Sequence, residues 1–126
     1  MRDHKSLLCW QLARDFSCLT QRLTIRYWAP PAGAAFEHLR RAAVSIRLNI
    51  AEGYARGTAR QFAHFLTIAY GSAVECAELL DLCAEVGLLP KAEAEPLVQL
   101  NHRIQALVIR LKQKCLPSQT ERERPS

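Results

Sequence analysis

The 126-residue chain lacks any continuous apolar run near the roughly 18 residues that a membrane-spanning helix requires. Its N-terminus does not resemble a secretory signal peptide, because Gln11, Arg14 and Asp15 interrupt the first apolar stretch. The five cysteines form no Cys-x-x-Cys pair, so we expect free thiols that pack as small apolar side chains. These absences predict a cytoplasmic protein with no membrane partner.

Motifs for cofactor or metal chemistry are also missing. The chain has no glycine-rich phosphate loop, no Gly-x-Ser-x-Gly elbow and no zinc-finger spacing. Its four histidines fall on different segments, and the Glu-x-x-His motif of di-iron bundles does not occur. Glu75, Glu78 and Asp81 have the spacing of a carboxylate stripe, which we interpret as a solvated face or a docking strip for arginines. We therefore expect no cofactor and no metal.

Lysine and arginine are absent from residues 61–90, which carry a net charge of −4, whereas residues 1–60 carry +6 and residues 91–126 carry +3. Thirteen of the 17 basic residues are arginines, which bind phosphate or carboxylate in a bidentate way. Two interpretations remain: basic and acidic segments pair within or between subunits, or the arginines bind nucleic acid. The candidates for nucleic-acid contacts are Arg14, Arg22, Arg26, Arg40, Arg47 and Arg60.

Strand and hairpin patterns are missing too, and apolar residues recur at helical spacing along almost the whole chain. The predicted helices span about 4–26, 35–56, 59–86 and 91–115. Prolines after Ala29 end the first helix, and residues 116–126 have the composition of a disordered tail. Short connections make neighbouring helices antiparallel. The sequence therefore predicts a single all-α domain over residues 1–115, an antiparallel up-down-up-down four-helix bundle.

Each predicted helix has one stripe that should face the core. The stripes are Leu8, Leu12, Phe16, Leu19 and Leu23; Leu39, Ala43, Ile46, Ile50 and Tyr54; Phe62, Phe65, Ala69, Ala73, Cys76, Leu80 and Cys83; and Leu97, Leu100, Ile104, Leu107 and Leu111. Asp3 is the predicted N-cap of the first helix, and Thr58 begins a capping box with Gln61. Gly71 interrupts the third helix at a cost of about 1 kcal/mol, so we expect another helix to approach its backbone.

The second predicted helix is apolar on two faces. Val44, Leu48, Ala51 and Ala55 form a second face roughly 130° from the core stripe. Because both faces need a cover, we expect a homo-oligomer with this helix at or near the interface. A polar stripe of Arg41, Ser45, Asn49, Glu52 and Arg56 lies between the two faces.

The polar stripe has two interpretations. Asn49 and Glu52 could combine an amide with a general base, or Glu52 pairs with Arg41 or Arg56 in a semi-buried network. We favour the network, because one carboxylate without a nearby histidine or nucleophile is a poor catalytic set. We therefore expect that the protein is not an enzyme.

The run from Leu39 to Tyr54, LRRAAVSIRLNIAEGY, is long and specific. Together with Gly71-Ser72-Ala73-Val74-Glu75, it resembles the bacterial four helix bundle protein family, which includes proteins encoded in intervening sequences of large-subunit ribosomal RNA genes. The chain is also similar in fold to the accessory variability determinant of diversity-generating retroelements. The resemblance covers about residues 7–112. Arg47 and Leu48 stand where the family usually has proline and serine, which adds charge and apolar surface.

The resemblance implies a left-handed bundle that assembles into a homo-oligomeric ring, with a homopentamer as the expected assembly. It implies no enzyme activity, and the retroelement relatives imply a basic ring that binds nucleic acid and a reverse transcriptase. We therefore expect a non-enzymatic adaptor that binds RNA or DNA; the alternative is a protein–protein interaction scaffold with no nucleic-acid role. The residues expected at the oligomer interface or in the polar network are Arg41, Ser45, Asn49, Glu52, Arg56, Val44, Leu48 and Glu75.

Overall fold

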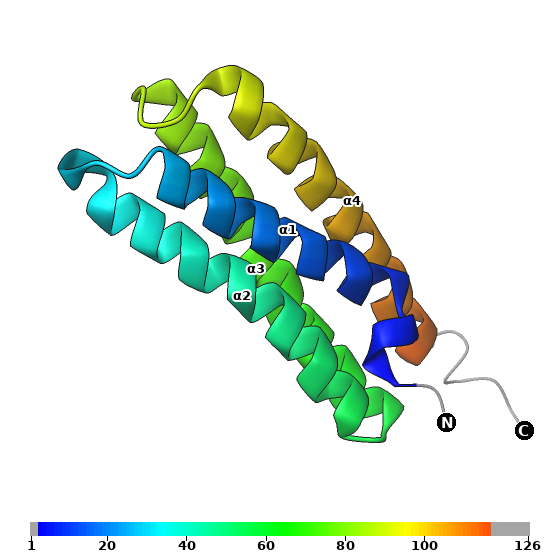
Figure 1. Ribbon diagram of the computed structural model, residues 1–126. Helices are drawn as coiled ribbons and strands as arrows, with labels where there is room; N and C mark the ends of the chain where they lie inside the picture. Colours follow the sequence, from blue (N-terminus) through cyan, green and yellow to red (C-terminus); the bar gives the residue numbers. More distant parts are fainter. Residues whose placement is uncertain (1–2, 117–126) are drawn as a thin grey trace, which may run out of the picture.

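The computed structural model describes residues 3–116, which contain four long α-helices and no β-strand. The helices are α1 (Leu8–Arg26), α2 (Gly33–Ala55), α3 (Ala59–Glu85) and α4 (Lys91–Cys115). Each of α1 and α3 packs against both α2 and α4, and α1 begins at the end of the bundle where α4 finishes (Figure 1). The predicted all-α four-helix bundle is confirmed. The predicted tail lies outside the described residues from position 117 onward.

Within residues 3–116, no helix combines the length and the apolar character that crossing a bilayer requires.

Turn residues set the boundary between α2 and α3 and the end of α3. Thr58 Oγ1 accepts a hydrogen bond from the backbone N–H of Gln61 at 3.2 Å, which caps the first turn of α3. Gly57 and Gly87 have φ angles of +85° and +79°, the left-handed conformation that glycine adopts without a steric penalty just past a helix end. The chain therefore reverses direction at these positions.

The starts of α1 and α2 differ from the prediction. Asp3 caps only a single 3₁₀ turn, His4–Ser6, and α1 begins at Leu8 rather than at residue 4. A second 3₁₀ turn, Pro30–Ala32, leads directly into α2 at Gly33, two residues before the predicted start. Proline has a φ angle that suits the first turn of a helix. The two prolines therefore end one helix and also begin the next.

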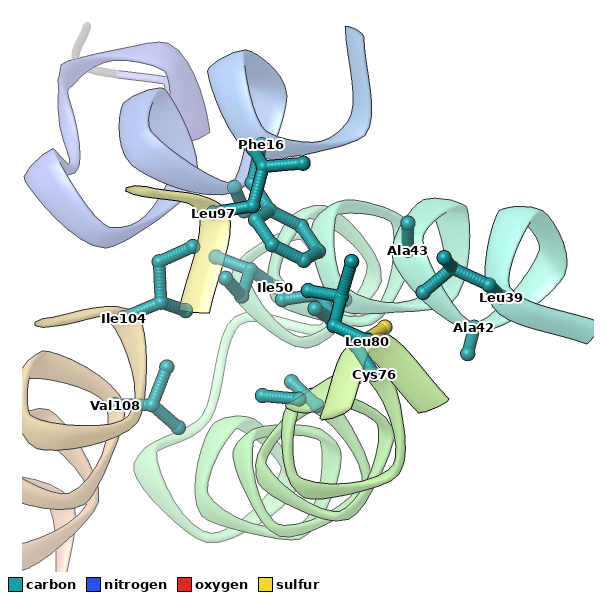
Figure 2. Close-up of a cluster of buried hydrophobic side chains, with 14 of the residues drawn as sticks. Phe16, Leu39, Ala42, Ala43, Ile50, Cys76, Leu80, Leu97, Ile104 and Val108 are labelled. Atoms are coloured by element: carbon teal, nitrogen blue, oxygen red, sulfur yellow. The ribbon is translucent and has the colours of Figure 1, made fainter. Parts of the chain in front are cut away.

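Side chains from all four helices form one core (Figure 2). Phe16 of α1, Ile50 of α2, Leu80 of α3 and Ile104 of α4 are all fully buried. The predicted stripe of α2 is buried, apart from the half-buried Tyr54 at its end. Close packing of this kind supplies most of the stability of a helical bundle.

The core face of α1 is rotated away from the predicted leucine stripe. Leu8 and Leu19 are 48% and 43% exposed, and among the five stripe residues Phe16 alone is fully buried. The core positions instead hold Cys9, Trp10, Ala13, Ser17, Thr20 and Thr24. The Thr24 hydroxyl donates to the Thr20 carbonyl of its own helix at 2.8 Å, which lowers the cost of burying it.

The predicted stripes of α3 and α4 are also partly wrong. At the start of α3, Ala63 and Leu66 fill the core, and Phe62 and Phe65 are only half buried. In α4, Leu100, Leu107 and Leu111 are half buried, whereas Asn101 and Val108 are fully buried. The Asn101 Nδ2 donates to the Ala73 carbonyl of α3 at 2.9 Å, and its Oδ1 accepts a bond from Gln105. A buried amide is tolerated here because both ends have partners.

Three of the five cysteines pack as predicted. Cys9, Cys76 and Cys83 are buried, and burial raises the pKa of Cys9 to about 11 and that of Cys76 to about 12. These thiols therefore stay protonated near neutral pH and are poor nucleophiles. Cys18 is exposed, contrary to the prediction, because it lies on the side of α1 that faces away from the buried residues of that helix.

Gly53 and Gly71 both lie inside helices, but Gly53 is closely packed and Gly71 faces open space. A Cβ on Gly53 of α2 would lie 2.7 Å from the Cβ of Phe65 and 3.0 Å from Cδ1 of Phe62, so the absence of a side chain lets α2 and α3 touch. The predicted close approach at Gly71 is wrong within one chain. Among the described residues, no atom outside its own helix backbone lies within 4 Å of the position that a Cβ would take there.

We expect Gly53→Ala to destabilise the protein by about 1–3 kcal/mol, because the new methyl group forces α2 and α3 apart. Gly33→Ala is the matched control, since a Cβ at Gly33 meets nothing within 4 Å. Urea denaturation followed by circular dichroism measures both free energies of unfolding. A Gly53→Ala variant as stable as Gly33→Ala would contradict the close contact.

We expect Thr20→Val to stabilise the protein by about 1 kcal/mol, because Thr20 is fully buried and its Oγ1 has no hydrogen-bond partner among the described residues. Thr24→Val is the control, since that hydroxyl is already bonded and its removal should give no comparable gain. The urea midpoints of both variants provide the comparison. A less stable Thr20→Val variant would show that the hydroxyl has a stabilising partner.

Candidate functional site

A half-buried polar network joins α2 to α3 at the middle of the bundle. The Oγ atoms of Ser45 and Ser72 lie 2.9 Å apart, across the two helices. The Asn49 Nδ2 donates to Ser45 Oγ at 3.0 Å and to the Ser45 carbonyl at 2.8 Å. Ser45 and Asn49 belong to the predicted stripe, and Ser72 is an additional member from α3. Spacing along α2 alone could not identify Ser72, because it does not specify how α3 is rotated.

The predicted carboxylate of the stripe has a partner on its own helix. The Glu52 Oε1 accepts bonds from Arg56 Nε at 2.9 Å and from Arg56 Nη2 at 2.8 Å. The same guanidinium lies 5.2 Å from the centre of the Phe65 ring, a cation–π distance. Arg41, the other predicted partner, is exposed and has no hydrogen bond or ion pair with the described residues. Glu52 and Arg56 therefore act as a pair, and Arg41 faces outward alone.

Glu75 makes a second cross-link between α3 and α2. Its carboxylate contacts the imidazole Nε2 of His38, and both side chains are about half exposed. His38 is a second residue that the sequence prediction missed. The contacts at His38, Ser45 and Gly53 follow one another along α2, so they define a continuous seam with α3.

The second apolar face of α2 is open to solvent within one chain. Leu48 is 59% exposed, Val44 is half buried, and Ala51 packs against the core instead of contributing to this face. A shallow hollow of about 490 Å³ runs along the face, and the charged residues that line it are Glu37, Arg40 and Arg41. The outer face of α2 therefore combines an uncovered leucine with two guanidinium groups.

The Trp10 ring contacts two of the arginines that are candidates for nucleic-acid contacts. The guanidinium groups of Arg14 and Arg47 lie 5.5 and 5.3 Å from the centre of its ring. Arg47 also donates to Ser17 Oγ at 3.2 Å, and Arg14 forms an ion pair with Asp15 at 3.0 Å. The Arg47 contacts hold α1 against α2, whereas the Arg14 contacts lie within α1, so part of the positive charge serves the fold.

Arg26 and Arg40 also have partners within the bundle. The Arg40 Nε donates to Gln21 Oε1 of α1 at 2.7 Å. Arg26 pairs with Glu93 of α4 at 3.2 Å and covers the Tyr27 ring at 5.3 Å. The Glu93 carboxylate beside the phenol raises the pKa of Tyr27. These side chains bridge α1 to both of its neighbours.

The remaining two candidates, Arg22 on α1 and Arg60 at the start of α3, are exposed. Neither forms a hydrogen bond or an ion pair with another residue between positions 3 and 116. Four of the six candidate arginines therefore have partners within the bundle, and two have none among the described residues. Arg22 and Arg60 are the exposed members of the set whose charge is not paired within the described part of the chain.

Acidic side chains line the outer surface of α3 near its C-terminal end. A hollow of about 480 Å³ is lined by Glu75, Glu78, Asp81 and Glu85, together with His38 and Leu82. Across the described part of the chain, no three His, Cys, Asp or Glu residues are arranged to hold a metal ion. The negative surface of α3 and the positive outer face of α2 lie on neighbouring helices.

A family model described as 23S rRNA-intervening sequence protein matches residues 5–110. The matched range includes α1 to α3 in full and most of α4. It also contains the two stretches that carry the resemblance, 39–54 and 71–75. Comparison with curated proteins gives no significant match. The chain belongs to the 23S rRNA-intervening sequence protein family.

Proposed function

We propose that the protein is a non-enzymatic, homo-oligomeric bundle that binds nucleic acid through exposed arginines. The uncovered outer face of α2 carries the self-association part of this proposal. Leu48 is a large apolar side chain at the edge of a broad hollow, and a second copy of the chain would remove it from water. The family resemblance to ring-forming relatives supports a homopentamer.

The polar network supports a role without catalysis. The Asn49 amide donates to Ser45, and the Glu52 carboxylate accepts both of its bonds from Arg56. An amide and a carboxylate held in this way stiffen a helix surface, whereas a general base must reach a proton on a substrate. We therefore assign the stripe to the subunit interface and to the α2–α3 seam.

The nucleic-acid part of the proposal rests on Arg22 and Arg60, which are exposed without a partner in the described residues. Repetition of these groups around an oligomer would give many phosphate contacts from a small charge per chain.

A protein–protein scaffold is the second candidate function. The observation that favours it is the use of Arg14, Arg26, Arg40 and Arg47 in contacts within the bundle. Fewer guanidinium groups are then available for phosphate. In this alternative the exposed faces bind a protein partner, of which a reverse transcriptase is one example.

We expect the wild-type protein to sediment as an oligomer at micromolar concentration and Leu48→Asp to weaken its association at least tenfold. Burial of one leucine side chain contributes about 2 kcal/mol, and a buried carboxylate adds a desolvation penalty. Ile25→Asp is the matched control, since Ile25 is 64% exposed but lies on α1. Sedimentation velocity measures the masses, and circular dichroism verifies the fold. A monomeric wild type would contradict self-association.

We expect binding to a labelled RNA to fall steeply between about 50 and 200 mM salt, because phosphate contacts release counterions. Arg22→Gln should make the salt slope shallower, since each phosphate that an arginine binds adds about 0.7–0.9 to it. Arg47→Gln is the contrasting variant: it should lower the melting temperature, because Arg47 contacts Ser17 and Trp10, and should leave the slope unchanged. Fluorescence anisotropy gives both slopes. Failure of the wild type to bind RNA at low salt would favour the scaffold.

A further inference from the structure

One outward stripe of α3 combines a notch with negative charge. Gly71, Glu75, Glu78 and Leu82 follow one another at steps of four, three and four residues, so they share a face of the helix. Leu82 is 45% exposed, and Glu78 has no partner within the described residues. A glycine inside a helix costs about 1 kcal/mol relative to alanine. Nothing described in this chain fills the space beside Gly71.

The outer face of α2 has a matching stripe. Glu37, Arg41, Val44 and Leu48 follow the same steps of four, three and four residues. Leu48 and Arg41 are both exposed, and Arg41 has no ionic partner in the described part of the chain. A large apolar group and a positive charge on α2 thus correspond to a notch and a negative charge on α3.

We propose that α2 of one copy packs against α3 of the next copy, with Leu48 over Gly71 and Arg41 beside Glu78. This arrangement rests on the proposed self-association and identifies the surfaces that carry it. Seven residues separate Arg41 from Leu48, and seven separate Gly71 from Glu78, so each pair spans about 10.5 Å along its helix. The spans are equal, so both contacts form together when the two helices are antiparallel.

A closed ring provides that antiparallel orientation. α2 and α3 are antiparallel within one chain, and rotation about a ring axis parallel to the bundle leaves each helix direction unchanged. α2 of one copy therefore meets α3 of the next in opposite directions. Each copy uses α2 on one side and α3 on the other, which is a heterologous contact. Contacts of this type close into rings when the rotation between copies is suitable.

Charge reversal tests the pairing. Arg41→Glu and Glu78→Arg each place like charges across the contact, and each should weaken association at least tenfold. The double variant should restore the wild-type mass, because it places opposite charges across every contact again. Glu95→Arg is the matched control, because Glu95 is an exposed acid on α4. Sedimentation velocity at several concentrations gives the masses, and circular dichroism verifies that each variant is folded.

Gly71→Leu tests the notch separately from the charges. The side chain at position 71 points into open space within one chain, so the helical content should be retained and the oligomer should dissociate.

The outcomes separate this pairing from self-association itself. An oligomeric wild type whose Arg41→Glu, Glu78→Arg and Gly71→Leu variants assemble as Glu95→Arg does would overturn the pairing and leave self-association intact. Single variants that dissociate but are not restored by the double variant would also overturn it. A monomeric wild type at all concentrations would instead overturn the proposed self-association.

Discussion

The contact between α2 and α3 at Gly53 sets the geometry on which the rest of the seam depends. Because Gly53 has no side chain, the backbone of α2 can lie directly against Phe65 near the turn that joins the two helices. The helices then remain close enough for Ser45 to reach Ser72. The same closeness brings the His38 imidazole to a carboxylate of α3 further along the seam. A residue that contributes no side chain therefore determines which polar groups of α2 find partners.

The fold was predictable from the sequence because leucine spacing and turn glycines indicate where the helices lie. Neither signal depends on how the helices pack together. The rotation of α1 was not predictable in this way. Two stripes with similar helical spacing run side by side on α1, one of leucines and one that includes Ala13, Ser17 and Thr20. Hydropathy predicts that the leucine stripe is buried, but in the bundle the stripe of smaller residues is buried instead. Hydroxyl groups that bond to carbonyls of their own helix, as in Thr24, reduce the free-energy cost of that choice.

The candidate site was predictable to the extent that it lies on one helix. The spacing along α2 placed Ser45 and Asn49 on one stripe, and the structure brings them together. The partners on other helices were not predictable, because a periodic pattern does not specify the rotation of a neighbouring helix. Ser72 belongs to this class, and so does Trp10, whose ring lies beneath Arg47 although 37 residues separate them in the sequence.

Some arginines of the chain make structural contacts, and others are exposed without a partner among the described residues. The Arg47 guanidinium contacts the Trp10 ring and donates to Ser17, and these contacts join α1 to α2. Arg22 remains on the outside of α1, away from the α2–α3 seam. Self-association through α2 and α3 would therefore leave the α1 surface open, and the two proposed activities would not compete. Each added copy would present another Arg22 to a nucleic acid, so a modest charge per chain becomes a multivalent surface only in the assembly.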